Sequence, residues 1–216
     1  MISPCSSLSL EEVLRHARKR GLDGVCITDH DTMEAGRFIQ EGIQEDGLCV
    51  ILGMEYATLS GDFLVFGPLE GLRPGLDAEE LLCEVDRQGG VSIAAHPFRE
   101  GRSVKPHIIE EGWCSIVEGV NGRNRAHENE RAFRSYANYG VSFVGGSDAH
   151  SLSELGRVTT YIESPVRSRQ DFVSSLRWGR FSLASLPFSR GILPSHSSRG
   201  TRTDLSRPPF RLTTPG

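Results

Sequence analysis

Short apolar runs alternate along this chain with longer stretches in which apolar residues recur every three or four positions. The first stretch of helical spacing begins after Ser9, which forms a capping-box sequence with Glu12, and it ends at Gly21. The same criteria predict further helices at about 33–44, 78–88, 107–111, 126–139 and 171–178. They predict short buried strands at 25–28, 49–54, 63–66, 91–95, 116–117, 141–144 and 158–162, with 63–66 as the hairpin partner of the strand before it.

Strands that alternate with helices are typical of α/β proteins with a parallel sheet or barrel. In such folds the polar side chains that follow the strands collect at one rim, which is where active sites lie. We therefore expect one α/β domain over residues 1–180, with its functional side chains at the carboxyl ends of the strands.

The composition changes from Phe181 onward. Residues 181–216 are rich in Ser, Pro and Arg, contain Asp204 as their only acidic residue and show little apolar periodicity. Such a segment cannot bury enough apolar surface to offset the entropy of ordering, so we predict a mostly disordered tail. Its arginines would suit nucleic acid, and a frame-shifted gene end would also explain it, but a solvated extension is the simpler interpretation.

Composition and charge argue against several classes of protein. The 216 residues are 38% hydrophobic and 24% charged, and the net charge of −4 gives no signal for a nucleic-acid or anionic-membrane partner. No apolar run approaches the roughly 20 residues that span a bilayer, and no signal peptide is evident, so we expect a cytoplasmic protein. The cysteines are scattered and never spaced as C-x-x-C, which indicates reduced thiols: Cys5, Cys26, Cys49, Cys83 and Cys114.

The glycine-rich turn after 141–144 presents two metal-type donors, Asp148 and His150. Because side chains alternate along an extended strand, both should point the same way, with Ala149 between them. A carboxylate beside an imidazole suits a divalent metal. Taken alone, however, the pair is explained equally well by a hydrogen-bonded turn.

Three other donors, His30, Glu55 and His96, also follow apolar runs. Each has a simpler explanation, as a hydrogen-bonded histidine, a salt-bridge carboxylate or a turn residue, but five such donors at strand ends rarely arise from packing alone. Mixed imidazole and carboxylate donors suit zinc, manganese or iron, and the lack of thiolate spacing argues against a structural zinc site. A carboxylate such as Glu55 could bridge two ions, which would favour a multinuclear hydrolytic centre.

Four motifs in this chain resemble the successive motifs of the PHP (polymerase and histidinol phosphatase) family: Ile27-Thr28-Asp29-His30-Asp31-Thr32, Gly53-Met54-Glu55, Ala95-His96-Pro97 and Gly146-Ser147-Asp148-Ala149-His150. The resemblance extends from about residue 3 to residue 179. It implies a distorted (β/α)7 TIM-like barrel with two or three divalent metal ions that hydrolyses phosphoesters.

The resemblance also assigns roles to residues. It implies that the metal ligands are His30, Glu55, His96, Asp148 and His150, with Glu55 as the bridge. It places Arg99 and Arg157 where relatives hold substrate phosphate, work that suits a guanidinium group, although a surface role explains either arginine equally well.

The chain departs from the family pattern at its start. The family begins with a strand that carries His-x-His, and this chain has no such motif, so we expect either a start codon placed too late or the loss of the first strand. Many relatives have a histidine near Asp62, which could itself bind a hard ion. Either Glu118 or Asn121 could supply a further donor, and Cys5 falls near another ligand position, where a buried structural thiol is the simpler interpretation.

The activity we predict is metal-assisted hydrolysis of a phosphomonoester, a nucleotide or another small phosphorylated metabolite, by a metal-activated water. Asp29 or Asp148 would orient that water, and an arginine would neutralise developing charge. Two alternatives stay open: an exonuclease-type PHP enzyme on single-stranded ends, and a truncated remnant without catalysis. The expected partner is a small phosphorylated substrate; nucleic acid is not favoured, no membrane is expected, and the oligomeric state is undetermined.

Overall fold

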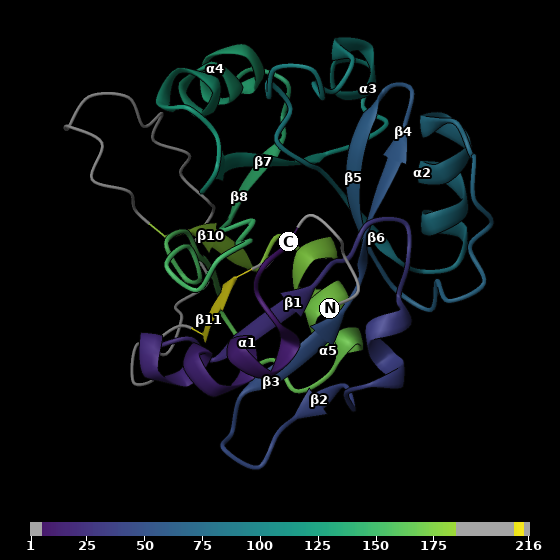
Figure 1. Cartoon of the computed structure of the whole chain (residues 1–216). Helices are drawn as coiled ribbons and strands as arrows, with labels where there is room; N and C mark the ends of the chain where they lie inside the picture. Colours follow the sequence, from purple (N-terminus) through teal and green to yellow (C-terminus); the bar gives the residue numbers. More distant parts are fainter. Residues whose placement is uncertain (1–5, 185–209, 214–216) are drawn as a thin grey trace.

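The computed structural model describes residues 6–184 and 210–213 (Figure 1). Its helices are α1 (Leu10–Ala17), α2 (Ala78–Arg87), α3 (Pro106–Glu110), α4 (Ala126–Tyr136) and α5 (Arg169–Arg177), together with the 3-10 helices η1 (Arg18–Arg20) and η2 (Glu34–Arg37). Its strands are β1 (Gly24–Ile27), β2 (Gly42–Ile43), β3 (Cys49–Leu52), β4 (Met54–Thr58), β5 (Gly61–Phe66), β6 (Val91–Ala94), β7 (Ile116–Asn121), β8 (Ser142–Gly146), β9 (Thr160–Ile162), β10 (Phe181–Leu183) and β11 (Phe210–Thr213).

The strands form two sheets. The first has the order β10-β9-β11-β1-β3-β2, in which β1 pairs in parallel with β3 and β11 while the other neighbours are antiparallel. The second has the order β4-β5-β6-β7-β8, antiparallel from β4 to β6 and parallel from β6 to β8. The architecture is therefore a mixed α/β fold, and β4 and β5 form the predicted hairpin.

The two sheets meet at two seams. At the first, β3 runs into β4 with only Gly53 between them, and an isolated parallel bridge joins His30 to Glu55. At the second, the hydroxyl of Thr160 on β9 donates to the carbonyl of Gly145 on β8 at 2.8 Å and accepts from its N–H at 2.9 Å. Backbone ladders thus do not run around the whole ring of described strands, and a closed barrel stays a prediction.

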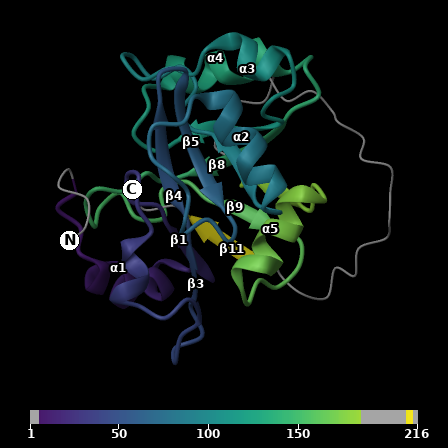
Figure 2. The same ribbon diagram turned by 90° about the vertical axis from the view of Figure 1, so that its right-hand side faces the viewer.

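Helices cover the outside of the sheets, and an apolar core fills the space between them. Along β5, Phe63 and Val65 pack in the cluster that contains α2 and α3, whereas Leu64 and Phe66 point into a second cluster with α5. Figure 2 shows α2, α3 and α4 beside the second sheet, with α1 near β1 and β3 of the first. This two-sided burial follows from the period-2 alternation of a strand that is covered on both faces.

The predicted helix over 33–44 is wrong. The structure has only the short η2 there, followed by β2 at Gly42–Ile43. Phe38 is 72% exposed and Ile43 is 51% exposed, so the apolar residues of this stretch do not form one buried helical face. Gly42 also has a φ of 106°, a conformation that a helix does not allow.

The predicted disordered segment from Phe181 is wrong at the two places that the structure describes. β10 and β11 both pair with β9, and Thr213 is fully buried where its hydroxyl donates to the carbonyl of Val158 at 2.8 Å. Local composition concealed these strands because their partner β9 is supplied from elsewhere in the chain. The remaining residues of that prediction, 185–209 and 214–216, lie outside the described residues.

None of the helices in the described part of the chain is both long and apolar enough to cross a membrane.

Candidate metal centre

Three of the polar residues that follow strands have a left-handed backbone. The φ angles are 53° at Asp31, 28° at His96 and 48° at Asp148, and among the described residues these are the non-glycine positions with positive φ. L-residues adopt this conformation at a cost, and such strain gathers at binding and catalytic sites. The strain therefore marks the turns after β1, β6 and β8 as one functional region.

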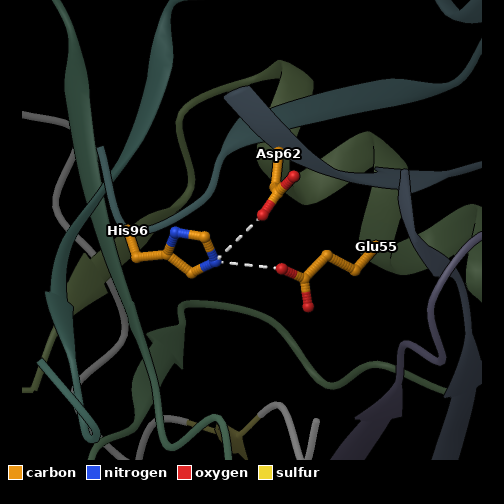
Figure 3. Close-up of side chains that lie close together, drawn as sticks. All are labelled: Glu55, Asp62 and His96. Atoms are coloured by element: carbon orange, nitrogen blue, oxygen red, sulfur yellow. Dashed lines mark hydrogen bonds and ion pairs between the residues drawn. The ribbon is translucent and has the colours of Figure 1, made fainter. Parts of the chain in front are cut away.

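One group of donors comes from the first three strands of the second sheet. Glu55 lies on β4, Asp62 lies on β5, and His96 follows β6, and one ligand atom from each lies within 4.8 Å of the others (Figure 3). The Nε2 of His96 is 2.9 Å from Glu55 Oε1 and 3.7 Å from Asp62 Oδ2. All three side chains are buried, which is the environment in which a cation would be held away from bulk water.

His30 joins this group through Glu55. Its Nδ1 is 3.7 Å from Glu55 Oε2, so the two carboxylate oxygens of Glu55 face different imidazoles. Backbone hydrogen bonds fix this arrangement, because Asp31 N–H donates to the Glu55 carbonyl at 2.9 Å and Glu55 N–H donates to the Asp29 carbonyl at 3.1 Å. We call His30, Glu55, Asp62 and His96 the open half of the centre.

The open half leaves buried polar atoms without partners. Within the described residues, His30 Nδ1, Asp62 Oδ2 and His96 Nδ1 have no hydrogen-bond partner. Buried polar atoms are nearly always satisfied, so each exception needs an explanation. A divalent ion among Glu55, Asp62 and His96 would satisfy Asp62, and the imidazole and carboxylate donors fit zinc, manganese or iron.

The pKa shifts of the two carboxylates in the open half also favour a cation site. Burial and the neighbouring Glu55 carboxylate raise the pKa of Asp62 above its ordinary value. Burial would also raise the pKa of Glu55, but the hydrogen bond from His96 and the charges of His96 and His30 outweigh it and lower that pKa. The carboxylates of Glu55 and Asp62 crowd one small volume, and Arg102 Nε, at 3.4 Å from Asp62 Oδ2, is a further cation beside them.

A second group comes from β7, from the turn after β8 and from the loop after β6. The NH2 group of Arg99 donates to Asp148 Oδ2 and to Asn121 Oδ1, each at 2.7 Å. Asn121 Nδ2 donates to Asp148 Oδ2 at 3.2 Å and to Glu118 Oε2 at 2.9 Å. We call Arg99, Glu118, Asn121 and Asp148 the closed half, because its members already satisfy one another.

The two halves face each other. Glu118 Oε2 accepts the backbone N–H of His96 at 2.8 Å, which ties the closed half to the turn of the open half. A small cavity is lined by Glu55 from one half and by Glu118, Asn121 and Asp148 from the other. Burial raises the pKa of Glu118 to about 7, against an ordinary value of 4.5.

His150 lies beside Asp148, but not because of strand alternation. β8 ends at Gly146, and Asp148 adopts the left-handed region, so the two residues are brought together by a turn. His150 Nδ1 is 3.4 Å from Asp148 Oδ1 and 3.1 Å from the Asp148 carbonyl, and its N–H donates to Glu154 at 2.9 Å.

Some of the site residues predicted from the sequence are not among the side chains that form the two halves of the centre. Arg157 is exposed, and its Nε donates to the Ser153 carbonyl at 3.0 Å rather than to residues of the centre. Cys5 lies outside the described residues. The backbone carbonyl of Asp29 accepts the N–H of Glu55, so the backbone of Asp29 helps to position Glu55.

Sequence reasoning missed Arg102 and Asn124. Arg102 contacts Asp62, and Asn124 Oδ1 accepts from Arg99 Nε at 3.0 Å. The spacing Arg99 to Arg102 after His96-Pro97 was a usable signal, because Arg99 N–H bonds the His96 carbonyl and Arg102 N–H bonds the Arg99 carbonyl in one compact turn. No comparable signal pointed to Asn124.

Comparison with known proteins gives partial matches along the sequence. A family model described as PHP-associated matches residues 126–181. Two uncharacterised proteins of Methanocaldococcus jannaschii are similar: MJ1587 is 36% identical over 93 residues, which are 42% of this chain and 54% of that protein. MJ0417 is 34% identical over 114 residues, which are 49% of this chain and 48% of that protein. The chain thus spans about half the length of these curated relatives.

Solved structures share the fold. PsfC from Pseudomonas syringae PB-5123 aligns with a TM-score of 0.66 and 21% identity, covering 82% of each chain. A two-domain protein from Bacteroides vulgatus ATCC 8482, described as containing a predicted PHP-like metal-dependent phosphoesterase, aligns at 0.59 and 18% identity over 83% of this chain and 61% of that one. A candidate metal-dependent phosphoesterase from Bifidobacterium adolescentis ATCC 15703 aligns at 0.54 and 18% identity over 80% and 90%.

These findings agree with the motifs at residues 27–32, 53–55, 95–97 and 146–150, each of which contributes one residue to the lining of a single small cavity: Thr28, Glu55, Ala95 and Asp148. The PHP-associated match over residues 126–181 supports the resemblance of this chain to the PHP domain family, and the fold shared with PHP-like structures agrees with it.

Proposed function

We propose that this chain is a metal-dependent phosphoesterase that hydrolyses a phosphomonoester, either a nucleotide or another small phosphorylated metabolite. The observation that carries the proposal is the buried group of Glu55, Asp62 and His96, in which Asp62 Oδ2 has no hydrogen bond within the described residues, in a chain that resembles the PHP family. A buried site with this donor set has no use as packing and suits a divalent ion.

In this proposal Glu55, Asp62 and His96 would hold the first ion, and Asp148 with His150 would hold another. Glu55 would be the carboxylate shared between ions, as the family resemblance implies, and its two oxygens face His30 and His96. Zinc, manganese or iron fits these donors, and the proposal is for two or three ions in the complete site. A bound ion of this kind lowers the pKa of a coordinated water from 15.7 to roughly 7 and polarises a phosphoryl oxygen.

The protein side chains supply positioning and charge. The guanidinium groups of Arg99 and Arg102 contact the two halves from one turn, so both are within reach of an anion at the cavity. Such donors stabilise the charge that develops on phosphoryl oxygens. Asp148 or Asp29 would orient the attacking water, as the sequence predicts.

The fold proposal that accompanies this function is a distorted (β/α)7 barrel. It is supported by the two contacts between the sheets, the bridge of His30 to Glu55 and the hydrogen bonds of Thr160 on β9 with Gly145 on β8. Closure would account for the donors Glu55, Glu118, Asn121 and Asp148, which come from separate strands and turns, lining a single cavity.

The test is turnover by the chain after loading with Mn²⁺, on a nitrophenyl phosphomonoester, a phosphodiester and a single-stranded oligonucleotide. The proposal expects hydrolysis of the monoester that EDTA removes, that Arg125→Met keeps and that Glu55→Gln loses. Degradation of the oligonucleotide without monoester hydrolysis would support the exonuclease alternative. Saturation with Mn²⁺ and no hydrolysis of any substrate would support the non-catalytic alternative.

A further inference from the structure

Arg99 holds a position in the closed half that resembles that of a bound cation. Its NH2 group lies 2.7 Å from an oxygen of Asp148 and 2.7 Å from an oxygen of Asn121, and its Nε lies 3.0 Å from an oxygen of Asn124. The three oxygens come from β7, from the loop after it and from the turn after β8. One positive group thus gathers three oxygens from separate parts of the chain, as a metal ion would.

Asp148 is consequently occupied on both sides. Its Oδ2 accepts from Arg99 at 2.7 Å and from Asn121 at 3.2 Å, and its Oδ1 lies 3.4 Å from His150 Nδ1. Asp62 in the open half differs, since its Oδ2 has no hydrogen bond within the described residues and its contact with the half-exposed Arg102 is longer, at 3.4 Å. An ion can therefore use Asp62 directly, whereas an ion that needs Asp148 has to take an oxygen from Arg99.

The connection of Arg99 to the chain allows such a release. Its backbone is held, because its N–H donates to the His96 carbonyl at 2.9 Å and its carbonyl accepts from Arg102 at 3.1 Å. Its side chain is 20% exposed and reaches the closed half through rotatable bonds. The guanidinium group can therefore leave Asp148 while the turn that carries it stays in place.

We propose that Arg99 is a built-in counter-ion of the closed half, which competes with a divalent ion for Asp148 and is released by that ion to bind a tetrahedral dianion. The inference deepens the proposed function and rests on it for the nature of the ion and the anion. Displacement and release give reciprocal coupling: the anion strengthens binding of the later ion, and the later ion strengthens binding of the anion by the same factor.

The test is a titration with Mn²⁺, in which electron paramagnetic resonance at room temperature reports the free ion, on the full chain and on Arg99→Met. Methionine keeps the apolar stem and removes the charge and the donors. In the unaltered chain we expect a tighter and a weaker class of sites; in Arg99→Met the weaker class should tighten about tenfold or more, since charge-assisted hydrogen bonds to Asp148 no longer compete. Arg125→Met, which removes an exposed arginine from the neighbouring loop, is the matched control and should behave like the unaltered chain.

An unchanged or weakened second class in Arg99→Met would overturn the proposal, and so would equal tightening in Arg125→Met, which would indicate a general charge effect. If Arg99→Met does not fold, Arg99→Lys replaces it, because lysine keeps the charge but loses the fork that holds three oxygens. It should tighten the second class by a smaller factor, and an unchanged class would again count against the proposal.

A second arm uses inorganic sulfate, a tetrahedral dianion whose Mn²⁺ salt is soluble, on the unaltered chain. Saturating sulfate should tighten the weaker Mn²⁺ class several-fold, and this coupling should be lost in Arg99→Met. No coupling in the unaltered chain would overturn the release step. Neither readout depends on turnover, so a chain that hydrolyses nothing can still confirm or refute the role of Arg99.

Discussion

The open and closed halves of the centre are built from the same kinds of side chain but are left in different states. In the open half, Glu55, Asp62 and His96 crowd together, and among the described residues Asp62 Oδ2 has no hydrogen bond. In the closed half, Asp148 is paired with Arg99 and Asn121, and the whole group is satisfied. The difference lies in the guanidinium group of Arg99, which is 20% exposed and hydrogen-bonds Asp148, whereas that of Arg102 is 47% exposed and lies 3.4 Å from Asp62.

Donor identity alone therefore does not define a metal site. A carboxylate already paired with arginine has to exchange one favourable contact for another, so an ion gains little net free energy there. A buried carboxylate oxygen without a hydrogen bond gives the ion a larger net gain, because binding relieves the cost of its burial. We accordingly expect the first ion to bind in the open half.

The largest effect on Mn²⁺ affinity and on turnover should come from Glu55→Gln. This change keeps the shape of the side chain but removes the charge and one strong acceptor from the open half. We expect Mn²⁺ affinity to fall by more than the roughly 10–100-fold that the loss of an outer partner costs. We expect turnover of a phosphomonoester to fall by about a thousandfold or more.

The matched control is Glu84→Gln, the same chemical change at an exposed pair with Arg87 on α2. Metal affinity and turnover should stay as in the unaltered chain. Equal Mn²⁺ affinity in Glu55→Gln and Glu84→Gln would remove Glu55 from the metal site.

The next effect should come from Asp148, where two substitutions separate chemistry from packing. Asp148→Asn keeps the hydrogen-bonding shape and tolerates the φ of 48°, so we expect a melting temperature close to that of the unaltered chain and about a hundredfold loss of turnover. Asp148→Ala should also lose turnover, but its melting temperature should fall, because Arg99 loses its carboxylate and alanine is strained at this φ. Normal turnover per folded molecule in Asp148→Asn would leave Asp148 with a turn-forming role only.

Glu118 of the closed half should also make the free energy of unfolding depend on pH. Burial raises the pKa of Glu118 from 4.5 to about 7. As pH rises through this window, the unfolded carboxyl group releases its proton first, so the unfolded state binds fewer protons and the free energy of unfolding decreases.

Glu118→Gln should remove that decrease, which we expect to be on the order of 2 kcal/mol. The measurement is urea unfolding of both proteins in EDTA at pH 4.5, 6 and 8. A constant difference between the two free energies of unfolding across this range would refute the shifted pKa of Glu118.

The smallest effect should come from Arg157. Its guanidinium group is exposed and bonds Ser153 within its own turn, away from both halves. Arg157→Met should therefore leave KM for a phosphomonoester within about twofold, whereas Arg102→Met, beside Asp62, should raise it more. A rise in KM for Arg157→Met as large as that for Arg102→Met would restore Arg157 as a substrate residue.

Sequence reasoning went furthest where local signals decide the structure. The capping box of Ser9 and Glu12 sets the start of α1, where Ser9 Oγ accepts the Glu12 N–H at 3.2 Å, and the Gly61-Asp62 turn leads into the β4–β5 hairpin as expected. It went wrong at 33–44, because helical spacing there was not matched by burial.

Pairing between distant segments lay beyond the sequence pattern. β9 at Thr160–Ile162 accepts β10 on one side and β11 on the other, and nothing local to Phe210–Thr213 indicates a strand with a fully buried Thr213. Non-local pairing of this kind depends on which sheet edge is left free once the rest of the chain has folded.

In the candidate metal centre, too, the sequence predicted what local motifs determine and missed what depends on contacts between distant segments. Motif order pointed to His30, Glu55 and His96, which the structure brings together. It could not show that Asp62 is left without a hydrogen bond or that Arg99 holds Asp148, because both facts depend on side-chain geometry between separate strands. The difference between the halves is therefore a property of the fold rather than of the motifs.

The most direct test of the central claim is the location of the first bound ion, measured by anomalous diffraction from a crystal of the full chain grown with about one equivalent of Mn²⁺. We expect the strongest peak among Glu55, Asp62 and His96, the group that combines one imidazole with two carboxylates. A first peak between Asp148 and His150 with the open half empty would contradict it, and so would the absence of any peak in either half.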